Sequence, residues 1–447
     1  MKCIRCDTDN ELQDRTGNQG RCKNCNHPFA FDPTTMKAPL NFTDRFFLKV
    51  IQDISAQNTL FFTPKQLFYF LDRRLKQKGF GSVGLLIFRY LFSNISYSII
   101  GNITVLGIIF SVFNNFVFST SLPWIPFGWN LFCIYYLYNL SNSQKLTFRM
   151  RQLSTTLLKI LGTFLLIIGI ISSFYINSIL IYWLTTIIFL IAFWLGFFQQ
   201  RRIAQIPQTF LITGAQMEGW LDSWARANGS VARLLPPPSN TLSPASQNNL
   251  PDPDVTAYSF DRVVVCQSDA IAQMLIANNF HFEYNCAILS ISGYPQGIFD
   301  TTMQMLHRNP LLQVFAFHDC SPQDMELVYQ LRTANWFPDN NIVIVDLGLS
   351  PRQILATKQG MFIQNSKASG QAAQHLPPHI RENLSQEELQ WLEQGNFVEL
   401  ESFTPQRLMQ ILHRGIANSQ QMDTVEDNSF ILVGDRDGYI YASESFG

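Results

Sequence analysis

The sequence predicts a multi-domain protein that joins a small cysteine-rich module, a bundle of membrane-spanning helices and an α/β domain with a parallel sheet. Three observations predict this fold class. Two C-x₂-C pairs stand near the N-terminus, long apolar segments without charge occupy the first half, and apolar strands alternate with helical segments in the second half. With 447 residues, the chain is long enough for two or three domains.

The composition also points to a membrane. The chain is 47% hydrophobic, and only 15% of its residues are charged, which is low for a soluble protein. Its net charge of −1 gives no global attraction to a polyanion such as nucleic acid. The N-terminus is polar and rich in cysteine, so we expect no secretory signal peptide.

Residues 1–32 predict a zinc ribbon. Four thiolates in the pattern C-x₂-C-x₁₅-C-x₂-C can close a tetrahedron around Zn²⁺ and leave no open position, which favours a structural ion. The segment is too short to bury a core, so the metal would supply its folding energy. Disulfides or free thiols are the alternative. The expected ligands are Cys3, Cys6, Cys22 and Cys25.

The remaining cysteines and the nearest histidine are not expected to join this site. His27 stands two residues after Cys25 and is interpreted as a neighbour. The other cysteines are too dispersed to form a set: Cys133, Cys266, Cys286 and Cys320. The sequence leaves open whether the ribbon binds nucleic acid, protein or nothing.

Residues 43–85 predict a helical segment. Thr63 is placed to cap a helix and Pro64 to occupy its first position. Basic residues follow, and they could touch phosphates or form the positive flank of a membrane span, which is the interpretation we favour. They are Arg73, Arg74, Lys76 and Lys78.

Residues 95–199 predict four transmembrane helices. No Asp, Glu, Lys or Arg stands between Arg89 and Lys145 or between Lys159 and Arg201. About 20 apolar residues cross a bilayer, which places spans near 95–117, 121–140, 154–174 and 177–199. Long buried core helices are the alternative. Spans without ionisable residues favour an anchor in the lipid bilayer over transport or sensing through the bundle.

Positive charges predict the topology. They precede the first span, separate the second from the third, and follow the fourth at Arg201 and Arg202. The other two hairpin loops carry none. The positive-inside rule therefore places both termini in the cytoplasm, with the chain as a multi-pass protein of the cytoplasmic (inner) membrane.

The rest of the chain predicts an α/β domain. Residues 200–233 are amphipathic, 234–256 form a Pro/Ser/Asn linker, and 257–447 form the domain. Strands are expected at 262–266, 285–292, 311–319 and 341–347, with helices at 268–279, 297–308, 322–334, 385–395 and 404–417 and a final hairpin at 430–442. Sites in such sheets lie at the carboxyl ends of the strands. Those ends carry Cys266, Gln267, Gly293, Asp319 and Asp346.

Several motifs at these strand ends resemble the TOPRIM domain, in the version found in the A subunit of type IIB topoisomerases. DCSPQD (319–324) resembles the family's DxDPxG, and SGYP (292–295) resembles a segment ending in GYP. VVVCQSDAIAQML (263–275) resembles the strand that ends in the family's glutamate, and DLGLSPRQI (346–354) a GLxP segment. Upstream, TPKQLFY (63–69) resembles a winged-helix stretch that carries a nucleophilic tyrosine.

The resemblance implies transesterification. A tyrosine oxygen attacks a DNA phosphodiester while one Glu and two Asp hold Mg²⁺. By position, Tyr69 would be the nucleophile and Asp319 the first aspartate. The pattern departs elsewhere in several places. The glutamate position holds Cys266 or Gln267, the second aspartate is Ser321, the motif glycine is Asp324, Ser292 precedes GYP, and Lys65 replaces an arginine.

These departures remove charge from the site. Three carboxylates give the family site about −3, whereas the matching residues here give about −1, which is a poor match for Mg²⁺. A rebuilt magnesium site is the alternative, with Asp269, Asp324 or Asp346 moving in. The residual set that could hold Mg²⁺ is Asp319, Ser321, Gln267 and Asp346.

The sequence therefore favours a membrane-anchored binding or docking protein with a zinc ribbon and a catalytically inactive TOPRIM-like domain. Its partner would be a nucleic acid, or a protein bound at the ribbon or the TOPRIM-like domain. The alternative is a membrane-tethered, Mg²⁺-dependent nuclease or DNA-cleaving transesterase that uses Tyr69 and Asp319. The oligomeric state and the pathway cannot be inferred from the sequence.

Overall fold

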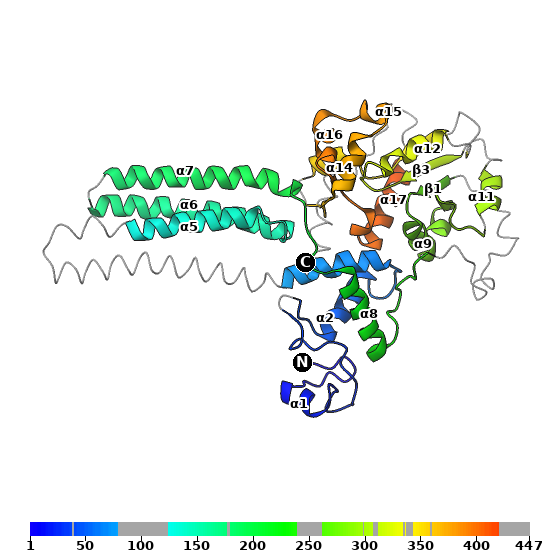
Figure 1. The fold of residues 1–447 in the computed structure, drawn as a ribbon, viewed down its shortest axis with the longest axis horizontal. Coiled ribbons are helices and arrows are strands. Elements are labelled where there is room, and N and C mark those ends of the chain that lie inside the picture. Colours follow the sequence, from blue (N-terminus) through cyan, green and yellow to red (C-terminus); the bar gives the residue numbers. More distant parts are fainter. Residues whose placement is uncertain are drawn as a thin grey trace. The chain divides into compact units, whose positions relative to one another are not determined.

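In the computed structural model, the chain forms two compact units, and Figure 1 shows both of them. Unit 1 consists of Met1–Asp72, Ile212–Thr357 and Phe362–Gly447, and unit 2 consists of Arg73–Leu211 and Lys358–Met361. The structure describes residues 1–37, 40–78, 124–176, 179–238, 262–297, 299–306, 312–333, 336, 343–357 and 360–419.

Helices make up most of the regular structure of unit 1. Residues 64–78 are helical, of which 64–72 belong to unit 1. This helix begins as predicted: Thr63 Oγ1 accepts the N–H of Gln66, and Gln66 Oε1 accepts the N–H of Thr63. The other helices are α1 (Leu12–Gly17), α2 (Asp44–Ile54), α8 (Gly214–Asn228), α9 (Asp269–Ala277), α10 (Phe280–Glu283), α11 (Phe299–Leu306), α12 (Leu327–Thr333), α13 (Pro351–Ala356), α14 (Lys367–Gln374), α15 (Pro378–Arg381), α16 (Gln386–Glu393) and α17 (Pro405–Ser419), with 3₁₀ turns η5 (Asp324–Glu326) and η6 (Leu400–Ser402).

The four predicted strands form one parallel sheet, which confirms the α/β prediction. They are β1 (Arg262–Cys266), β2 (Cys286–Ser290), β3 (Gln313–Phe317) and β4 (Val343–Asp346), in the order β2-β1-β3-β4. Within the sheet, β1 lies between β2 and β3. The carboxyl ends of β1 and β3 therefore lie at the point where the strand order switches, the usual place for a site.

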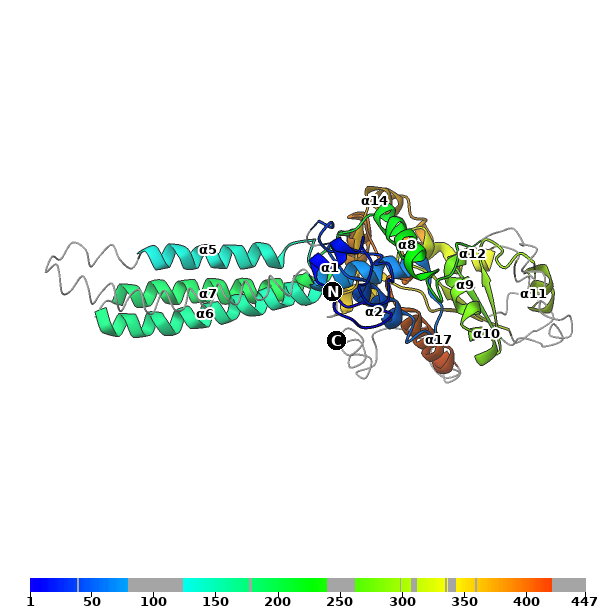
Figure 2. The same cartoon turned by 90° about the horizontal axis from the view of Figure 1, so that it is seen from below.

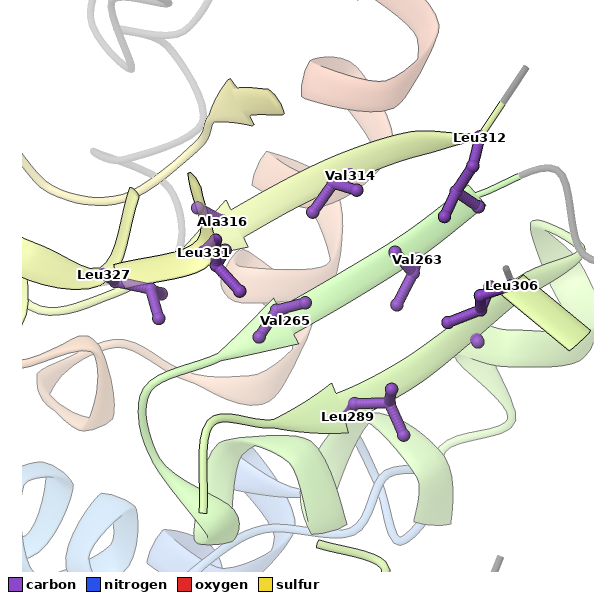
Figure 3. Packing of buried hydrophobic residues seen from close by; sticks show 10 residues of the cluster. Val263, Val265, Leu289, Leu306, Leu312, Val314, Ala316, Leu327 and Leu331 are labelled. Atoms are coloured by element: carbon purple, nitrogen blue, oxygen red, sulfur yellow. The ribbon is translucent and has the colours of Figure 1, made fainter. Parts of the chain in front are cut away.

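Side chains from alternate strand positions form the core on one face of this sheet. Figure 3 shows Val263 and Val265 of β1, with Val314 of β3, on the same side as Leu327 and Leu331 of α12. The intervening residues of β1 are buried as well. Burial of both faces explains the uninterrupted apolar runs from which the strands were predicted.

The N-terminal part of unit 1 is completed by a helix from far along the chain. The ring of Phe42 packs edge-on against Trp220 of α8, and Phe47 of α2 packs against Trp224. Phe62 forms a parallel bridge with Leu234. Unit 1 thus closes around residues that lie on both sides of Arg73–Leu211 in the sequence. Unit 2 is therefore an insertion within unit 1.

Unit 2 contains long helices that run side by side in Figures 1 and 2. Its core includes Cys133, Leu158 and Ala192, one from each helix. Close packing of α6 and α7 depends on small residues, because a Cβ at Gly169 would lie only 2.1 Å from Thr185 Oγ1. The helices are α5 (Trp124–Ser141), α6 (Phe148–Ile176) and α7 (Ile179–Arg202), followed by the 3₁₀ turn η2 (Ile203–Gln205).

Two segments of unit 2, Phe148–Ile171 and Tyr182–Gln205, are long and apolar enough to cross a membrane. They match the third and fourth predicted spans. Only 41% and 22% of their apolar windows is buried, whereas a core helix of a soluble protein would be mostly buried. Of the other two predicted spans, 121–140 falls largely on α5, which does not meet the same criteria, and 95–117 lies outside the described residues.

The connection between α5 and α6 meets the segment that follows α7. Arg151 is fully buried and donates to the carbonyl oxygens of Ser143 (2.9 Å), Ile206 (2.8 Å) and Pro207 (3.1 Å). The α5–α6 connection and the segment after α7 are therefore tied together. The predicted hairpin 430–442 and most of the linker 234–256 lie outside the described part of the chain.

Candidate functional site

The four N-terminal cysteines converge on one point, as predicted. Their Sγ atoms all lie within 4.8 Å of one another, with Cys3 to Cys25 at 3.7 Å and Cys6 to Cys22 at 3.5 Å. These distances exceed the S–S bond of about 2.05 Å. They approach the edge of about 3.8 Å in a tetrahedron with Zn–S bonds of about 2.3 Å. The cluster is a possible metal site whose chemistry is consistent with zinc.

The two cysteine pairs have the same local geometry. Asp7 and Asn26 each follow a pair with φ of 55° and 56°, and each donates its N–H to the carbonyl of the first cysteine, Cys3 or Cys22, at 3.0 Å. Short polar residues tolerate this left-handed conformation better than most. Asn10, which the sequence analysis did not single out, is fully buried and donates from Nδ2 to Cys22 Sγ at 3.5 Å.

The cysteine-rich segment 1–32 is held to helices of unit 1 by polar contacts. His27 Nε2 forms a hydrogen bond with Asn228 Oδ1 of α8 at 2.8 Å, so His27 is a neighbour of the cluster and no part of it. The carboxylate of Asp44 in α2 accepts the N–H groups of Ala30 (2.9 Å) and Phe31 (2.8 Å). The position of the cysteine cluster is therefore coupled to the packing of α2 and α8.

At the switch point of the sheet, Asp319 meets a segment from about 80 residues later in the chain. Cys320 and Val398 form an antiparallel bridge with N–H···O distances of 2.9 and 3.1 Å. This bridge places the following residues beside the end of β3. Asp319 Oδ1 consequently accepts the N–H of Leu400 at 2.7 Å. The bridge also brings Glu399 and Glu401 to the strand ends.

Tyr69 lies at the same place, with only 1% of its surface exposed. Its hydroxyl donates to Glu399 Oε2 and accepts a hydrogen bond from Gln364 Nε2. Its ring packs edge-on against Phe362, with centroids 5.0 Å apart. Gln364 belongs to β5 (Gln364–Asn365), which pairs with β6 (Asn396–Phe397) just before Glu399. The structure thus brings Tyr69 and the Asp319 region together.

Lys65, one turn before Tyr69, pairs with both glutamates. Its Nζ lies 2.9 Å from Glu399 Oε1 and 3.4 Å from Glu401 Oε2. Thr63 Oγ1 donates to Glu401 Oε1 at 3.0 Å. We call these side chains the Tyr69 network: Thr63, Lys65, Tyr69, Gln364, Glu399 and Glu401.

Burial and the shared negative charge shift the titration of these groups. Burial and then the Glu399 carboxylate raise the pKa of Tyr69 far above its usual value. Burial raises the pKa of Asp319 to about 7, aided by the carboxylates of Asp324 and Glu399 and opposed by the N–H of Leu400. Tyr69 is therefore a neutral phenol at physiological pH.

His318 and Asp346 form a separate ion pair beside this site. His318 Nε2 lies 3.1 Å from Asp346 Oδ1, and Nδ1 donates to the carbonyl of Asp319 at 2.8 Å. Burial alone would lower the pKa of His318, but the Asp346 carboxylate raises it to about 9. Gly348 makes room for the ring, because a Cβ there would lie 2.3 to 2.6 Å from imidazole atoms.

The residual magnesium set is engaged in contacts within the chain. Ser321 Oγ donates to Asp324 Oδ2 at 2.5 Å, and Asp346 is paired with His318. Gln267 donates its N–H to the carbonyl oxygen of Phe317, and its buried Oε1 has no hydrogen-bond partner among the residues that the structure describes. In the described part of the chain, no three ligand atoms of His, Cys, Asp or Glu at the strand ends lie within 4.8 Å of one another. The magnesium site stays a prediction.

Glu399, Glu401 and Gln364 were missed by the sequence analysis. The only signal was the alternation of two acids in VELES (398–402) after a short apolar stretch. Nothing in that pattern links it to Asp319. Comparison of the chain with models of known families and with curated proteins found no match.

Proposed function

We propose that this protein is a membrane-anchored cytoplasmic docking protein whose TOPRIM-like domain has kept its fold and lost DNA cleavage. The observation that carries this proposal is the state of Tyr69. Its hydroxyl is buried between Glu399 and Gln364, where a DNA phosphodiester has no access to it. A raised pKa also makes the phenol a weaker nucleophile.

The carboxylates near the strand ends support the same proposal. Glu399 and Glu401 share the Lys65 ammonium, Asp319 accepts a backbone N–H, and Asp346 holds His318. Magnesium is bound through carboxylates that keep oxygens free for the ion. Here the oxygens of Glu399 and Glu401 hold residues 63–69 against the α/β part of unit 1, and those of Asp319 and Asp346 are used within the α/β part itself. We infer that the former catalytic region now serves as a structural joint.

Membrane anchoring is supported by unit 2. Two of its segments combine sufficient length with largely exposed apolar surface, and lipid would cover such a surface at low cost. Arg151 joins the α5–α6 connection to the segment after α7. This contact agrees with a topology in which both segments lie on the cytoplasmic side. Four spans, with both termini in the cytoplasm, are the arrangement we propose for the inner membrane.

The docking partner would be a nucleic acid or a protein, bound at the zinc ribbon or at the TOPRIM-like domain. The basic residues of the ribbon are balanced by acids, for example Arg15 by Asp32 and Lys23 by Asp14. Phosphate binding needs unbalanced positive charge. The ribbon therefore favours a protein partner over nucleic acid.

A cleavage assay tests the loss of catalysis. The full-length, zinc-loaded protein in detergent is incubated with supercoiled DNA and Mg²⁺ or Mn²⁺, and the reaction is stopped with SDS to trap covalent adducts. We expect neither nicked DNA nor a protein–DNA adduct. Fluorescence anisotropy with the same DNA then distinguishes the two classes of docking partner. Binding without cleavage would indicate a nucleic acid, and no binding would indicate a protein.

Matched variants make a positive result interpretable. Tyr69→Phe and Asp319→Ala remove the proposed remnants of the catalytic set, and Tyr329→Phe changes a half-exposed tyrosine outside the network. An adduct that disappears in Tyr69→Phe and persists in Tyr329→Phe would overturn the proposal.

One observation favours the alternative, a membrane-tethered nuclease or transesterase. The structure gathers Tyr69, Lys65 and Asp319 with Glu399 and Glu401, which restores acidic groups that the motif comparison counted as lost. In this alternative, the buried Tyr69 would be a closed state that must open before Mg²⁺-dependent cleavage. The assay above decides between the two.

A further inference from the structure

The strand ends hold more negative charge than the TOPRIM-like motif suggested. Asp319 and Asp324 follow β3, and Glu399 and Glu401 follow β6. The Glu399 carboxylate lies close enough to both aspartates to raise their pKa. Such a concentration of carboxylates is costly unless a cation compensates it. Within the described part of unit 1, the cation that meets the glutamates is the ammonium of Lys65.

Lys65 is held in place by its surroundings. It stands in the first turn of the 64–78 helix, next to the buried capping residues Thr63 and Gln66. Gln66 Nε2 also donates to the carbonyl of Phe403, just beyond the glutamates. The start of this helix and the 399–403 segment are therefore fixed together on either side of the ammonium.

The geometry at Nζ is that of a shared cation. Two carboxylates from different residues direct one oxygen each at the ammonium, at 2.9 and 3.4 Å. The other oxygens of the same carboxylates receive the hydroxyls of Tyr69 and Thr63. All four glutamate oxygens thus have partners, and the two that face Lys65 depend on its charge.

We propose that the Lys65 ammonium is a tethered counter-ion that occupies the place of a divalent metal ion between Glu399 and Glu401, so that the Tyr69 network holds together without a metal. Removal of the lysine charge would convert this place into a binding site for a hard divalent cation. The inference goes beyond the docking function and does not depend on the identity of the partner.

The exchange of one cation for the other is chemically reasonable. Mg²⁺ and Mn²⁺ prefer carboxylate and other oxygen ligands and complete their shell with water. A magnesium–oxygen bond of about 2.0 to 2.1 Å is shorter than the contacts to Nζ, so both glutamates would have to move inward. Their partial exposure, 18% and 10% of the side chains, leaves access to solvent water for the remaining coordination positions.

Titration with Mn²⁺, followed by the electron paramagnetic resonance signal of the free ion, tests the proposal. The full-length, zinc-loaded protein in detergent is compared with Lys65→Met, Lys65→Arg and the double variant Lys65→Met/Glu401→Gln. We expect the wild type and Lys65→Arg to bind no Mn²⁺ at the network. Lys65→Met should gain one site with Kd of about 1 mM or below, the range of weak natural sites for hard cations, and Glu401→Gln should weaken that site at least tenfold.

Three results would overturn the proposal. The first is a wild type that binds Mn²⁺ as tightly as Lys65→Met. The second is a Lys65→Met protein that gains no site, and the third is a gained site that Glu401→Gln leaves unchanged. Lys65 is half-exposed, so the substitution should be tolerated. If Lys65→Met does not show a native circular dichroism spectrum, Lys65→Gln is titrated instead and judged by the same criteria.

Discussion

Single residues at the strand ends differ in how far the sequence could predict them. Asp319 was found because an apolar strand runs directly into it. Glu399 was not, because the bridge between Cys320 and Val398 brings it there from another part of the chain. Lys65 appeared only as a substituted arginine, and its role depends on the two glutamates that it meets. The chemistry of this site depends on contacts between segments that lie far apart in the sequence, and the pattern of neighbouring residues does not predict such contacts.

The close approach of Gly348 to His318 gives the first prediction. Gly348→Ala would drive a Cβ into the imidazole ring, so we expect a loss of about 1–3 kcal/mol in the free energy of unfolding of unit 1. Gly219→Ala in α8 is the matched control, because no atom of the described residues lies within 4 Å of its Cβ position. It should be neutral or stabilising by about 0.5–1 kcal/mol. Urea unfolding of both variants checks this, and equal effects would contradict the steric argument.

The pair of His318 and Asp346 predicts a pH dependence. The pKa of His318 is raised to about 9 in the folded protein, above its unfolded value of about 6.5. Its stabilisation is therefore complete below pH 6.5 and is lost as the pH rises through 9. We expect the wild type to lose about 1–2 kcal/mol more than Asp346→Asn over this range, since the half-exposed aspartate is screened by solvent.

Urea unfolding at pH 6.0, 7.5 and 9.5 measures this difference. Asp300→Asn changes an exposed aspartate of α11 and serves as the control. The ion pair would play no part in stability if Asp346→Asn and the wild type followed parallel curves.

Whole elements were predicted better than single residues. The four strands lie where apolar runs placed them, because a sheet buried on both faces needs such runs. The helix at 64–78 begins at its predicted cap. The short strands β5 and β6 could not be predicted, since their sequence, Gln364–Asn365 and Asn396–Phe397, is mostly polar. These strands form because the fold of the surrounding chain brings the two segments side by side.

The ribbon gives a prediction at the level of elements. We expect one zinc per chain, and about none in Cys22→Ser, because three thiolates hold the ion much less tightly. The loss should increase hydrogen exchange in residues 1–32 and at α2, whose Asp44 binds Ala30 and Phe31 of the ribbon. Mass spectrometry of the native protein measures the metal. Cys286→Ser, in β2, should keep the zinc, and equal metal loss in both variants would contradict the assignment.

At the scale of the whole molecule, the insertion of unit 2 into unit 1 could not be predicted. The sequence indicated helices before and after the predicted membrane spans without showing that they pack together. The contacts of Phe42 with Trp220 and Phe47 with Trp224 join parts about 180 residues apart. This arrangement means that the predicted 257–447 domain is not an independent unit, since the Tyr69 network draws on residues 63–69.

Membrane topology provides the prediction at this scale. Asn142→Cys, in the connection between α5 and α6, should react with a membrane-impermeant maleimide only when the cytoplasmic side is accessible. Asn177→Cys, at the start of the fourth predicted span, should react only from the opposite side. The parent chain gives the background from native cysteines. Labelling of both positions from the same side would contradict the topology.

We propose that the Tyr69 hydroxyl serves as a structural link to Glu399. A double-mutant cycle of Tyr69→Phe, Glu399→Ala and the double variant tests it most directly, with hydrogen exchange of amides in residues 64–72 and 396–403 as the readout of the opening free energy. We predict a coupling of about 1–3 kcal/mol, as expected for a buried hydrogen bond to a charged group. Additive effects of the two substitutions would show that Tyr69 and Glu399 do not hold these segments together.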